Sequence, residues 1–216
     1  MHLDARNWPC KMAAVPQASI PQLVLASASP RRSELLRNAG FHFTVHPAHV
    51  DESMLPGEQP LEHATRLARE KARAIRQQYP DDFVLGADTI VVVENQVLSK
   101  PRDAADATRM LGLLSGRSHR VITGVCLTGS QPSGKNFEEV RAETTEVFVR
   151  TLSAEEIASY IATGEPMDKA GAYAIQGRAS RWIPKIVGCY FNVVGLPVPL
   201  VSRMLREHGF DSELAG

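Results

Sequence analysis

The sequence predicts a single α/β or α+β domain bent around a cleft, and three observations support this fold class. Segments with the period of strands alternate with segments with the period of helices. A chain of 216 residues is long enough to bury a sizeable core. The composition, 44% hydrophobic and 22% charged, is ordinary for a globular protein, and no repeat or low-complexity linker interrupts it. We expect one domain over residues 21–210, a poorly ordered extension over 1–20 and a tail over 211–216.

The charge balance and the cysteines narrow the classes of function. The 24 basic and 24 acidic residues cancel, which argues against a general nucleic-acid binder. No apolar run is long enough to span a membrane, and residues 1–20 lack the pattern of a signal peptide. Cys10, Cys126 and Cys189 form neither a metal motif nor a disulfide framework. We expect reduced thiols in a cytoplasmic protein that binds neither nucleic acid nor membrane.

The first strand and the helix after it form a candidate anion site. Residues 22–26 are an apolar strand, Ser29 is a good helix N-cap and Pro30 suits the first helical position. A helix N-terminus that follows a strand and a small-residue turn offers free N–H groups to anions. Arg31 and Arg32 lie in the first turn, where the helix dipole disfavours cations. Their presence indicates a bound phosphate, and the alternative is two solvated arginines.

The next segments contain one candidate carboxylate. Residues 41–45 alternate like a half-buried strand. His46 and His49 have a metal-like spacing without a third ligand, so we expect surface histidines. Asp51 and Glu52 follow in a loop, where they cap a turn or supply a carboxylate to a site.

A long helix over residues 60–79 precedes the central strand. Its apolar face is bordered by Lys71, which either extends to water or enters a cleft. The apolar run over residues 84–93 is interrupted by Asp88 and Thr89. Asp is depleted inside strands because its carboxylate is costly to bury. Asp88 is therefore either a residue at a strand end or a catalytic or metal-binding carboxylate on a rigid strand.

The second half of the chain continues the alternation. Asn95-Gln96 predicts a hairpin turn, and the return strand over 97–99 delivers Lys100. Asp103 caps a helix that extends to about residue 114. Residues 121–127 and 140–149 are strands. The loop over 129–135 is close to a phosphate-binding P-loop, but Asn136 replaces the required hydroxyl residue and no helix pattern follows, so we reject that interpretation.

The last third contains a candidate ligand-facing loop. Ser153 and Glu156 form a capping box for a helix to about residue 163. Residues 168–177 combine charge, small residues and an amide between glycines, which is typical of a loop that faces a ligand and is a poor core segment. Residues 192–197 lead into a last helix that ends near residue 207.

Seven short motifs form an ordered set. They are Ser27–Arg32, Val50–Glu52, Ala68–Ala72, Gly86–Thr89, Lys100–Pro101, Asp168–Gly177 and Val194–Pro197. Together they resemble the Maf family of nucleoside triphosphate pyrophosphatases, from about Leu23 to Arg206. The resemblance implies an elongated, bent mixed sheet flanked by helices, with a central cleft, as in the house-cleaning inosine triphosphate pyrophosphatases.

The resemblance also implies a reaction and its residues. A nucleoside triphosphate would be hydrolysed between the α- and β-phosphates, with a divalent cation such as Mg²⁺, Mn²⁺ or Co²⁺. The residues that match the family's phosphate contacts are Ser27, Arg31, Arg32, Lys71 and Lys100. Glu52 and Asp88 match its acidic, metal-binding centre, and Asp88 matches its proton acceptor. A neutral chain needs such a local group of cations to bind a triphosphate.

Three positions are similar to the dTTP/UTP pyrophosphatases of this family. They are Arg31, Thr89 and Gln176, where the sister group acting on 7-methylguanosine triphosphate has a bulky residue, Gln and Glu. A neutral amide both donates and accepts hydrogen bonds, which suits a pyrimidine edge. Modified pyrimidine nucleotides stay open as substrates. A regulator of septum formation and cell division with little catalysis is the alternative function, and a homodimer is one open assembly.

Overall fold

Residues 21–131 and 134–210 are described by a computed structural model of the chain. The extension predicted over residues 1–20, the tail over 211–216 and Cys10 lie outside these residues. Within the described part, no helix is both long enough and apolar enough to cross a membrane.

A mixed sheet forms the centre of the fold, with seven strands in the described ranges. They are β1 (Leu23–Leu25), β2 (Phe43–Val45), β3 (Phe83–Val93), β4 (Gln96–Leu98), β5 (Ser118–Ser130), β6 (Asn136–Phe148) and β7 (Lys185–Val187). Their order is β2-β1-β3-β5-β6-β7, and β4 pairs with β3. Strand β1 pairs in parallel with β2 and β3, and the remaining pairs are antiparallel. The predicted mixed α/β class is confirmed.

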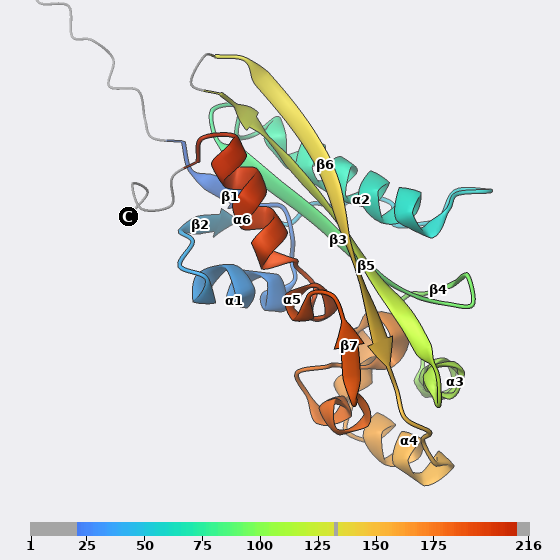
Figure 1. Ribbon diagram of the computed structural model, residues 1–216. Coiled ribbons are helices and arrows are strands. Elements are labelled where there is room, and N and C mark those ends of the chain that lie inside the picture. Colours follow the sequence, from blue (N-terminus) through green and yellow to red (C-terminus); the bar gives the residue numbers. More distant parts are fainter. Residues whose placement is uncertain (1–20, 132–133, 211–216) are drawn as a thin grey trace, which may run out of the picture.

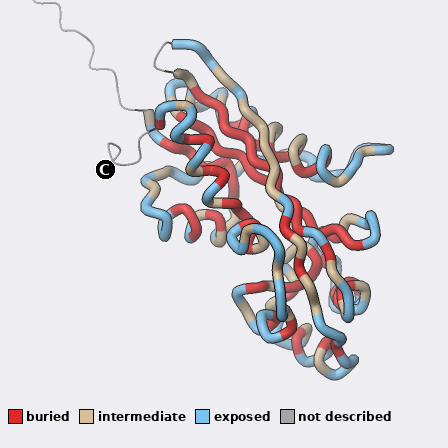
Figure 2. Tube along the Cα trace, viewed as in Figure 1, coloured by how far each residue is buried: buried red, intermediate tan, exposed pale blue. Residues whose placement is uncertain are grey.

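Helices cover both faces of this sheet. They are α1 (Pro30–Asn38), α2 (Pro60–Arg76), α3 (Ala104–Leu114), α4 (Ala154–Ile161), α5 (Tyr190–Val194), α6 (Val198–Glu207) and the short 3-10 helices η1 (Glu165–Asp168), η2 (Ala170–Ala172) and η3 (Arg178–Trp182). Helix α2 lies along one face of the long strands, and α1, α5 and α6 lie on the other (Figure 1). Helices α3 and α4 gather at one end of β5 and β6 (Figure 1). Buried residues follow β3 and β5 along most of their length (Figure 2).

Alternation along β3 assigns its side chains to the two faces. Val84 belongs to the buried cluster that contains Ala72 of α2, whereas Leu85 belongs to the cluster that contains Leu36 of α1. Asp88 has the parity of Val84 and therefore faces α2. It lies in the middle of an 11-residue strand, so the interpretation as a residue at a strand end is wrong.

Two glycines bring α2 close to the sheet. A Cβ atom on Gly86 would lie 2.2 Å from the carbonyl oxygen of Ala68, and one on Gly124 would lie 2.3 Å from that of Ala64. Both distances are far below van der Waals contact, so only glycine allows the helix backbone to lie at this depth. This close packing sets the height of every α2 side chain above β3.

A gap in the sheet lies beside Asp88. Strand β1 pairs with β3 only as far as Leu25 and Leu85, and β4 pairs with β3 only from Val91 onward. Between these pairings, residues 86–90 of β3 have no strand neighbour on that side among the described residues. We call this gap the notch.

Two local predictions about strands are wrong. The hairpin turn is centred on Glu94 and Asn95, with φ of 48° and 65°, and Gln96 already belongs to β4. Positive φ at both central residues is what a tight two-residue hairpin requires. The half-buried strand pattern places Val45 on a buried face, yet Val45 is 42% exposed. Strand β2 is short and lies at the edge of the sheet, so little covers it.

The prediction for residues 168–177 is half wrong. Ala172 is fully buried, Tyr173 is 8% exposed, and a Cβ on Gly171 would lie 3.0 Å from the Val91 side chain. Residues 171–173 are therefore tightly packed in the core, whereas Asp168 and Gln176 at the two ends are exposed. The small residues of this segment fill the space between β3 and α3. The sequence did not reveal this burial, because the segment has no hydrophobic period. The loop between β5 and β6 is as predicted, since β6 and no helix follows it.

Candidate functional site

A cleft of about 650 Å³ opens at the notch. Its walls come from the start of α1, the loop before α2, the middle of β3, the end of β4 and the segment around η1 and η2. All nine residues predicted for the site line it: Ser27, Arg31, Arg32, Glu52, Lys71, Asp88, Thr89, Lys100 and Gln176. Segments separated by about 150 positions in the chain thus meet at one place.

Lys71 joins the two predicted carboxylates. Its Nζ lies 2.7 Å from Asp88 Oδ1 and 2.5 Å from Glu52 Oε1. The side chains of Lys71 and Asp88 are 9% and 11% exposed, whereas that of Glu52 is 58% exposed. Helix α2 is thus the element that directs a cation into the cleft, and the sequence alternative of a lysine extending to water is wrong.

Glu52 is ionised at neutral pH. Partial burial raises its pKa, but the hydrogen bond from Lys71 and the positive charges of Lys71, Lys100 and Arg32 together lower it below the usual value. The charge of Lys100, which lines the same cleft after β4, thus acts on Glu52. The site thus combines anionic oxygens with several cations within reach of each other.

Arg32 is held in place by the protein itself. Its Nε donates to Gly195 O at 2.8 Å, Nη1 donates to Ser27 Oγ and Ala87 O, and Nη2 donates to Thr89 Oγ1. A guanidinium has five N–H groups, so one remains for a ligand. Burial lowers the pKa of Arg32, and the negative charge of Asp88 opposes that effect. The Ala87 carbonyl, left without a strand partner by the notch, is satisfied in this way.

Ser27 comes from the turn before α1 and Arg31 from the first turn of that helix, and both line the cleft. Ser27 Oγ accepts hydrogen bonds from Arg32 Nη1 at 3.0 Å and from the Ser29 amide at 3.2 Å, which leaves its proton free to donate. Arg31 Nη1 lies 3.1 Å from Asp168 Oδ2, so an ion pair connects α1 with η1 across the cleft. Both arginines of the first helical turn face the cleft region, and the alternative of two solvated arginines is wrong.

The hydroxyl of Thr89 is already engaged. It accepts from Arg32 Nη2, donates to Gly195 O at 3.1 Å and lies 2.9 Å from Thr123 Oγ1. Gln176, in contrast, is exposed where it lines the cleft. These two of the three predicted specificity residues therefore differ in what they can offer a ligand.

Some residues of the site were missed from the sequence. Asp168 and Lys169 line the cleft, and Lys169 Nζ lies 2.5 Å from Asp168 Oδ1. Their signal was a charged pair directly before a run of small residues, which identified the segment but not these side chains. His63 also lines the cleft from α2.

Glu52 and Asp88 are the side chains in the cleft that could hold a divalent cation. In the described ranges, no group of three or more His, Cys, Asp or Glu side chains is arranged to hold a metal ion. Glu52 and Asp88 nevertheless share one ammonium group, so their two carboxylates already enclose a place for positive charge. Hard oxygen donors in this number suit Mg²⁺, which keeps waters and takes substrate phosphates as further ligands.

These features define a class of α/β protein in which a mixed sheet opens at a notch and cations surround two carboxylates. Comparison with known proteins gives the family. The Maf-like protein family model matches residues 22–208. The chain belongs to the Maf-like protein family, as its motifs predicted.

Its curated relatives cover most of the chain. It is 61% identical to the dTTP/UTP pyrophosphatase of Koribacter versatilis (strain Ellin345) over 87% of this chain and 94% of that protein. It is 53% identical to the dTTP/UTP pyrophosphatase of Symbiobacterium thermophilum over 88% of this chain and 95% of that protein. Among solved structures, the Staphylococcus aureus Ham1 protein aligns over 86% of this chain and 98% of that chain, with 14% identity and a TM-score of 0.46.

Proposed function

We propose that this chain is a nucleoside triphosphate pyrophosphatase that hydrolyses dTTP and UTP to the monophosphate and pyrophosphate, in a house-cleaning role. Relatives at 61% and 53% identity bear the name dTTP/UTP pyrophosphatase. The observation that carries the proposal is the meeting of Glu52 and Asp88 at Lys71 inside a cleft lined by further cations. Two carboxylates without such cations would repel a triphosphate.

The triphosphate is bound by the cations and by Ser27. The proton of Ser27 Oγ and the remaining N–H of Arg32 donate to phosphate oxygens, while Arg31 and Lys100 neutralise charge. Arg31 first exchanges its contact with Asp168 for one with the substrate. Because Arg32 is fixed by protein oxygens, it orients the phosphates with little loss of entropy.

Asp88 accepts the proton of the attacking water. The water oxygen forms a bond to the α-phosphorus, the bond to the bridging oxygen breaks, and pyrophosphate leaves with the electron pair. Asp88 is suited to this role because β3 holds it rigidly and Lys71 orients its carboxylate. Glu52 and Asp88 would hold a divalent cation, and when bound that cation would neutralise phosphate charge and acidify water.

Specificity for a pyrimidine comes from Arg31, Thr89 and Gln176. The Gln176 amide donates to a base carbonyl and accepts from a ring N–H. Since the Thr89 hydroxyl is occupied, Thr89 acts indirectly, by fixing Arg32 and the Gly195 backbone. Arg31 contacts the substrate from the cleft lining.

A nucleotide panel tests the proposal. The purified chain is incubated with standard and modified nucleoside triphosphates and with Mg²⁺, Mn²⁺ or Co²⁺, and pyrophosphate is measured. We expect release with dTTP and UTP ahead of purine nucleotides. Nucleotide binding without pyrophosphate release under every condition would favour the alternative, a regulator of septum formation.

A further inference from the structure

The loop that carries Glu52 has little local reason to be ordered. Residues 46–59 connect β2 to α2 without helix or strand, and residues 51–57 are all exposed. Fixing the backbone of each such residue costs conformational entropy. The Glu52 carboxylate nevertheless stands 2.5 Å from Lys71. Other contacts must therefore hold this loop.

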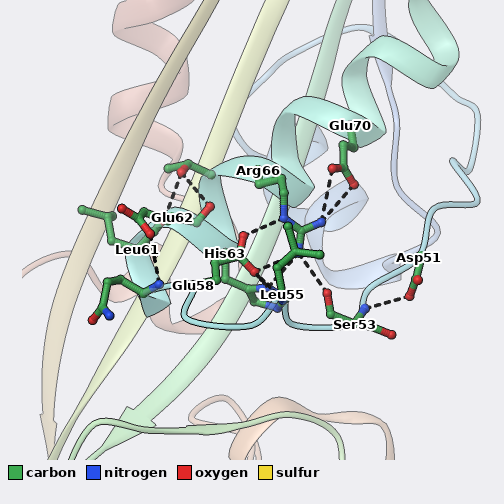
Figure 3. A network of polar contacts seen from close by, with 11 residues as sticks. Asp51, Ser53, Leu55, Glu58, Leu61, Glu62, His63, Arg66 and Glu70 are labelled. Carbon is green, nitrogen blue, oxygen red and sulfur yellow. Dashed lines mark hydrogen bonds and ion pairs between the residues drawn. The ribbon is translucent and has the colours of Figure 1, made fainter.

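Two of those contacts involve one ion pair, between Arg66 on α2 and Glu58 near the end of the loop. Arg66 Nη2 donates to the backbone oxygen of Ser53, the residue after Glu52, at 2.9 Å. Glu58 Oε2 accepts from the Leu55 amide at 3.0 Å. The loop backbone is thus bound on both sides of Met54 by Arg66 and Glu58 (Figure 3).

Arg66 and Glu58 bind each other through two contacts. Arg66 Nε lies 2.6 Å from Glu58 Oε1 and Nη2 lies 3.0 Å from Oε2, a forked arrangement. Their side chains are 19% and 7% exposed. The hydrogen bonds from Arg66 are the main reason that the pKa of Glu58 is lowered to about 2. Glu70 contacts Arg66 from the next helical turn, which fixes the guanidinium further (Figure 3).

His63 completes this cluster on the cleft side. Its Nδ1 lies 2.9 Å from Glu58 Oε2 and 3.1 Å from Arg66 Nη2, and one nitrogen satisfies only one of these contacts at a time. His63 is 4% exposed and lines the cleft. Helix α2 therefore supplies both the Lys71 that Glu52 contacts and the Arg66 that holds the backbone beside Glu52.

We propose that Arg66 and Glu58 form a clamp that positions the Glu52 carboxylate for the divalent cation. Neither residue touches the substrate, so both are positioning residues. The inference rests on the proposed function, because the metal role of Glu52 belongs to it. Outer partners that orient metal ligands typically change metal affinity or activity about 10- to 100-fold when removed.

The test compares Arg66→Met with a matched control on the same helix. Arg73 also makes a forked pair, with Glu138 at 2.6 and 2.8 Å, but that pair joins α2 to β6 and not to the loop. We expect Arg66→Met to raise the Mg²⁺ concentration for half-maximal pyrophosphate release about 10- to 100-fold. Excess Mg²⁺ should restore most of kcat, and Arg73→Met should leave both quantities near wild type.

Two further readouts separate positioning from a general structural effect. Amide hydrogen exchange over residues 46–59, measured without nucleotide or metal, should become faster in Arg66→Met and not in Arg73→Met. In a Glu52→Gln background, adding Arg66→Met should cause little further loss, because the clamp acts through Glu52. If Arg66→Met does not fold, the same measurements are made on Arg66→Lys. This variant keeps the positive charge but cannot make the two-contact pair with Glu58.

Unchanged exchange in the loop together with an unchanged Mg²⁺ requirement would overturn the clamp. An undiminished effect of Arg66→Met in the Glu52→Gln background would overturn it as well. A wild-type chain that releases no pyrophosphate would contradict the proposed function only, and the exchange measurement would still decide whether Arg66 holds the loop.

Discussion

Asp88 makes an ion pair with Lys71 from the middle of β3, a strand that is mostly apolar. A buried carboxylate of this kind needs a charged or hydrogen-bonding partner, because an unpaired one is costly. Lys71 provides that partner and also contacts Glu52, so it links the two carboxylates.

Asp88→Asn should abolish most turnover while the fold persists. Asn is nearly isosteric, so packing in β3 is retained, but it neither accepts the water proton nor holds a cation well. We expect pyrophosphate release to fall about 100- to 10,000-fold, and further if Asp88 also anchors the metal. Nucleotide affinity measured on the same variant should stay similar. Near-normal release would shift the catalytic role to Glu52.

Gln176→Glu should weaken the use of dTTP and UTP. A carboxylate cannot donate to a base carbonyl, and an unpaired polar group costs about 1–3 kcal/mol, or about ten- to a hundredfold. The measurement is kcat/KM for dTTP and UTP in wild type and variant, with folding checked by thermal melting. Unchanged selectivity would place Gln176 away from the base.

At the residue scale, the sequence was enough to identify side chains but not their contacts. Asp88, Lys71 and Glu52 could be predicted because a carboxylate inside an apolar run and a lysine beside an apolar helix face are unusual. The protein contacts of Arg32 could not, because they depend on Gly195, which lies 163 positions away. Asp168 was hidden for the same reason, since its partner Arg31 is 137 positions away.

Helix α2 is the element on which the site depends most. It carries Lys71 and the clamp residue Arg66, and its depth over β3 and β5 is set by Gly86 and Gly124. Its apolar face was readable from the sequence, because a period of 3.6 residues is a local signal. The need for glycine beneath it was not, since that depends on which strands the helix crosses.

Gly124→Ala should therefore destabilise the fold. The added Cβ would lie 2.3 Å from the Ala64 oxygen, and a helix backbone cannot move away as a flexible side chain can. Overpacking of this kind costs about 1–3 kcal/mol or more. Chemical unfolding measures the free-energy difference.

Gly112→Ala provides the opposite control. Gly112 lies in α3, and a Cβ atom added there would meet nothing within 4 Å, so alanine should stabilise that helix by about 0.5–1 kcal/mol. Equal stability of Gly124→Ala and wild type would contradict the close packing of α2 on the sheet.

Elements with strong local patterns were predictable, as were the short strands β1, β2 and β4, whereas the short elements of the second half were not. The long strands, α2 and the capped helices α3 and α4 were found within a few residues of their ends. Strand β7, helix α5 and the three 3-10 helices were missed, because their three to five residues show no clear period and lie in no longer apolar or alternating run. These short elements are ordered by packing against distant parts of the chain.

At the scale of the whole molecule, the core extends continuously from α1 and α6 to α3 and α4. His119 on β5 is buried, with 2% of its surface exposed. Its Nε2 lies 2.8 Å from the Tyr173 hydroxyl. Burial lowers the pKa of His119 to about 4 from an ordinary 6.5. Protonation of His119 therefore favours the unfolded chain.

The titration of His119 should make the free energy of unfolding depend on pH. Between pH 6.5 and about 4 the unfolded state binds more protons at His119, so the free energy of unfolding should fall as the pH is lowered through this window. His119→Gln retains a hydrogen-bonding side chain without a titration, and its stability should fall less over the same range. Urea unfolding of both chains across these pH values checks this, and parallel curves would contradict it.

The most direct test of the account is phosphorus NMR of dTTP incubated with the wild-type chain and Mg²⁺. If the notch cleft directs water to the α-phosphorus, thymidine monophosphate and pyrophosphate should appear together in equal amounts, with no diphosphate intermediate. Asp88→Asn should show the same products at a greatly reduced rate. Release of orthophosphate and thymidine diphosphate, or no reaction with any pyrimidine triphosphate, would contradict the assignment of this cleft to pyrophosphate-releasing hydrolysis.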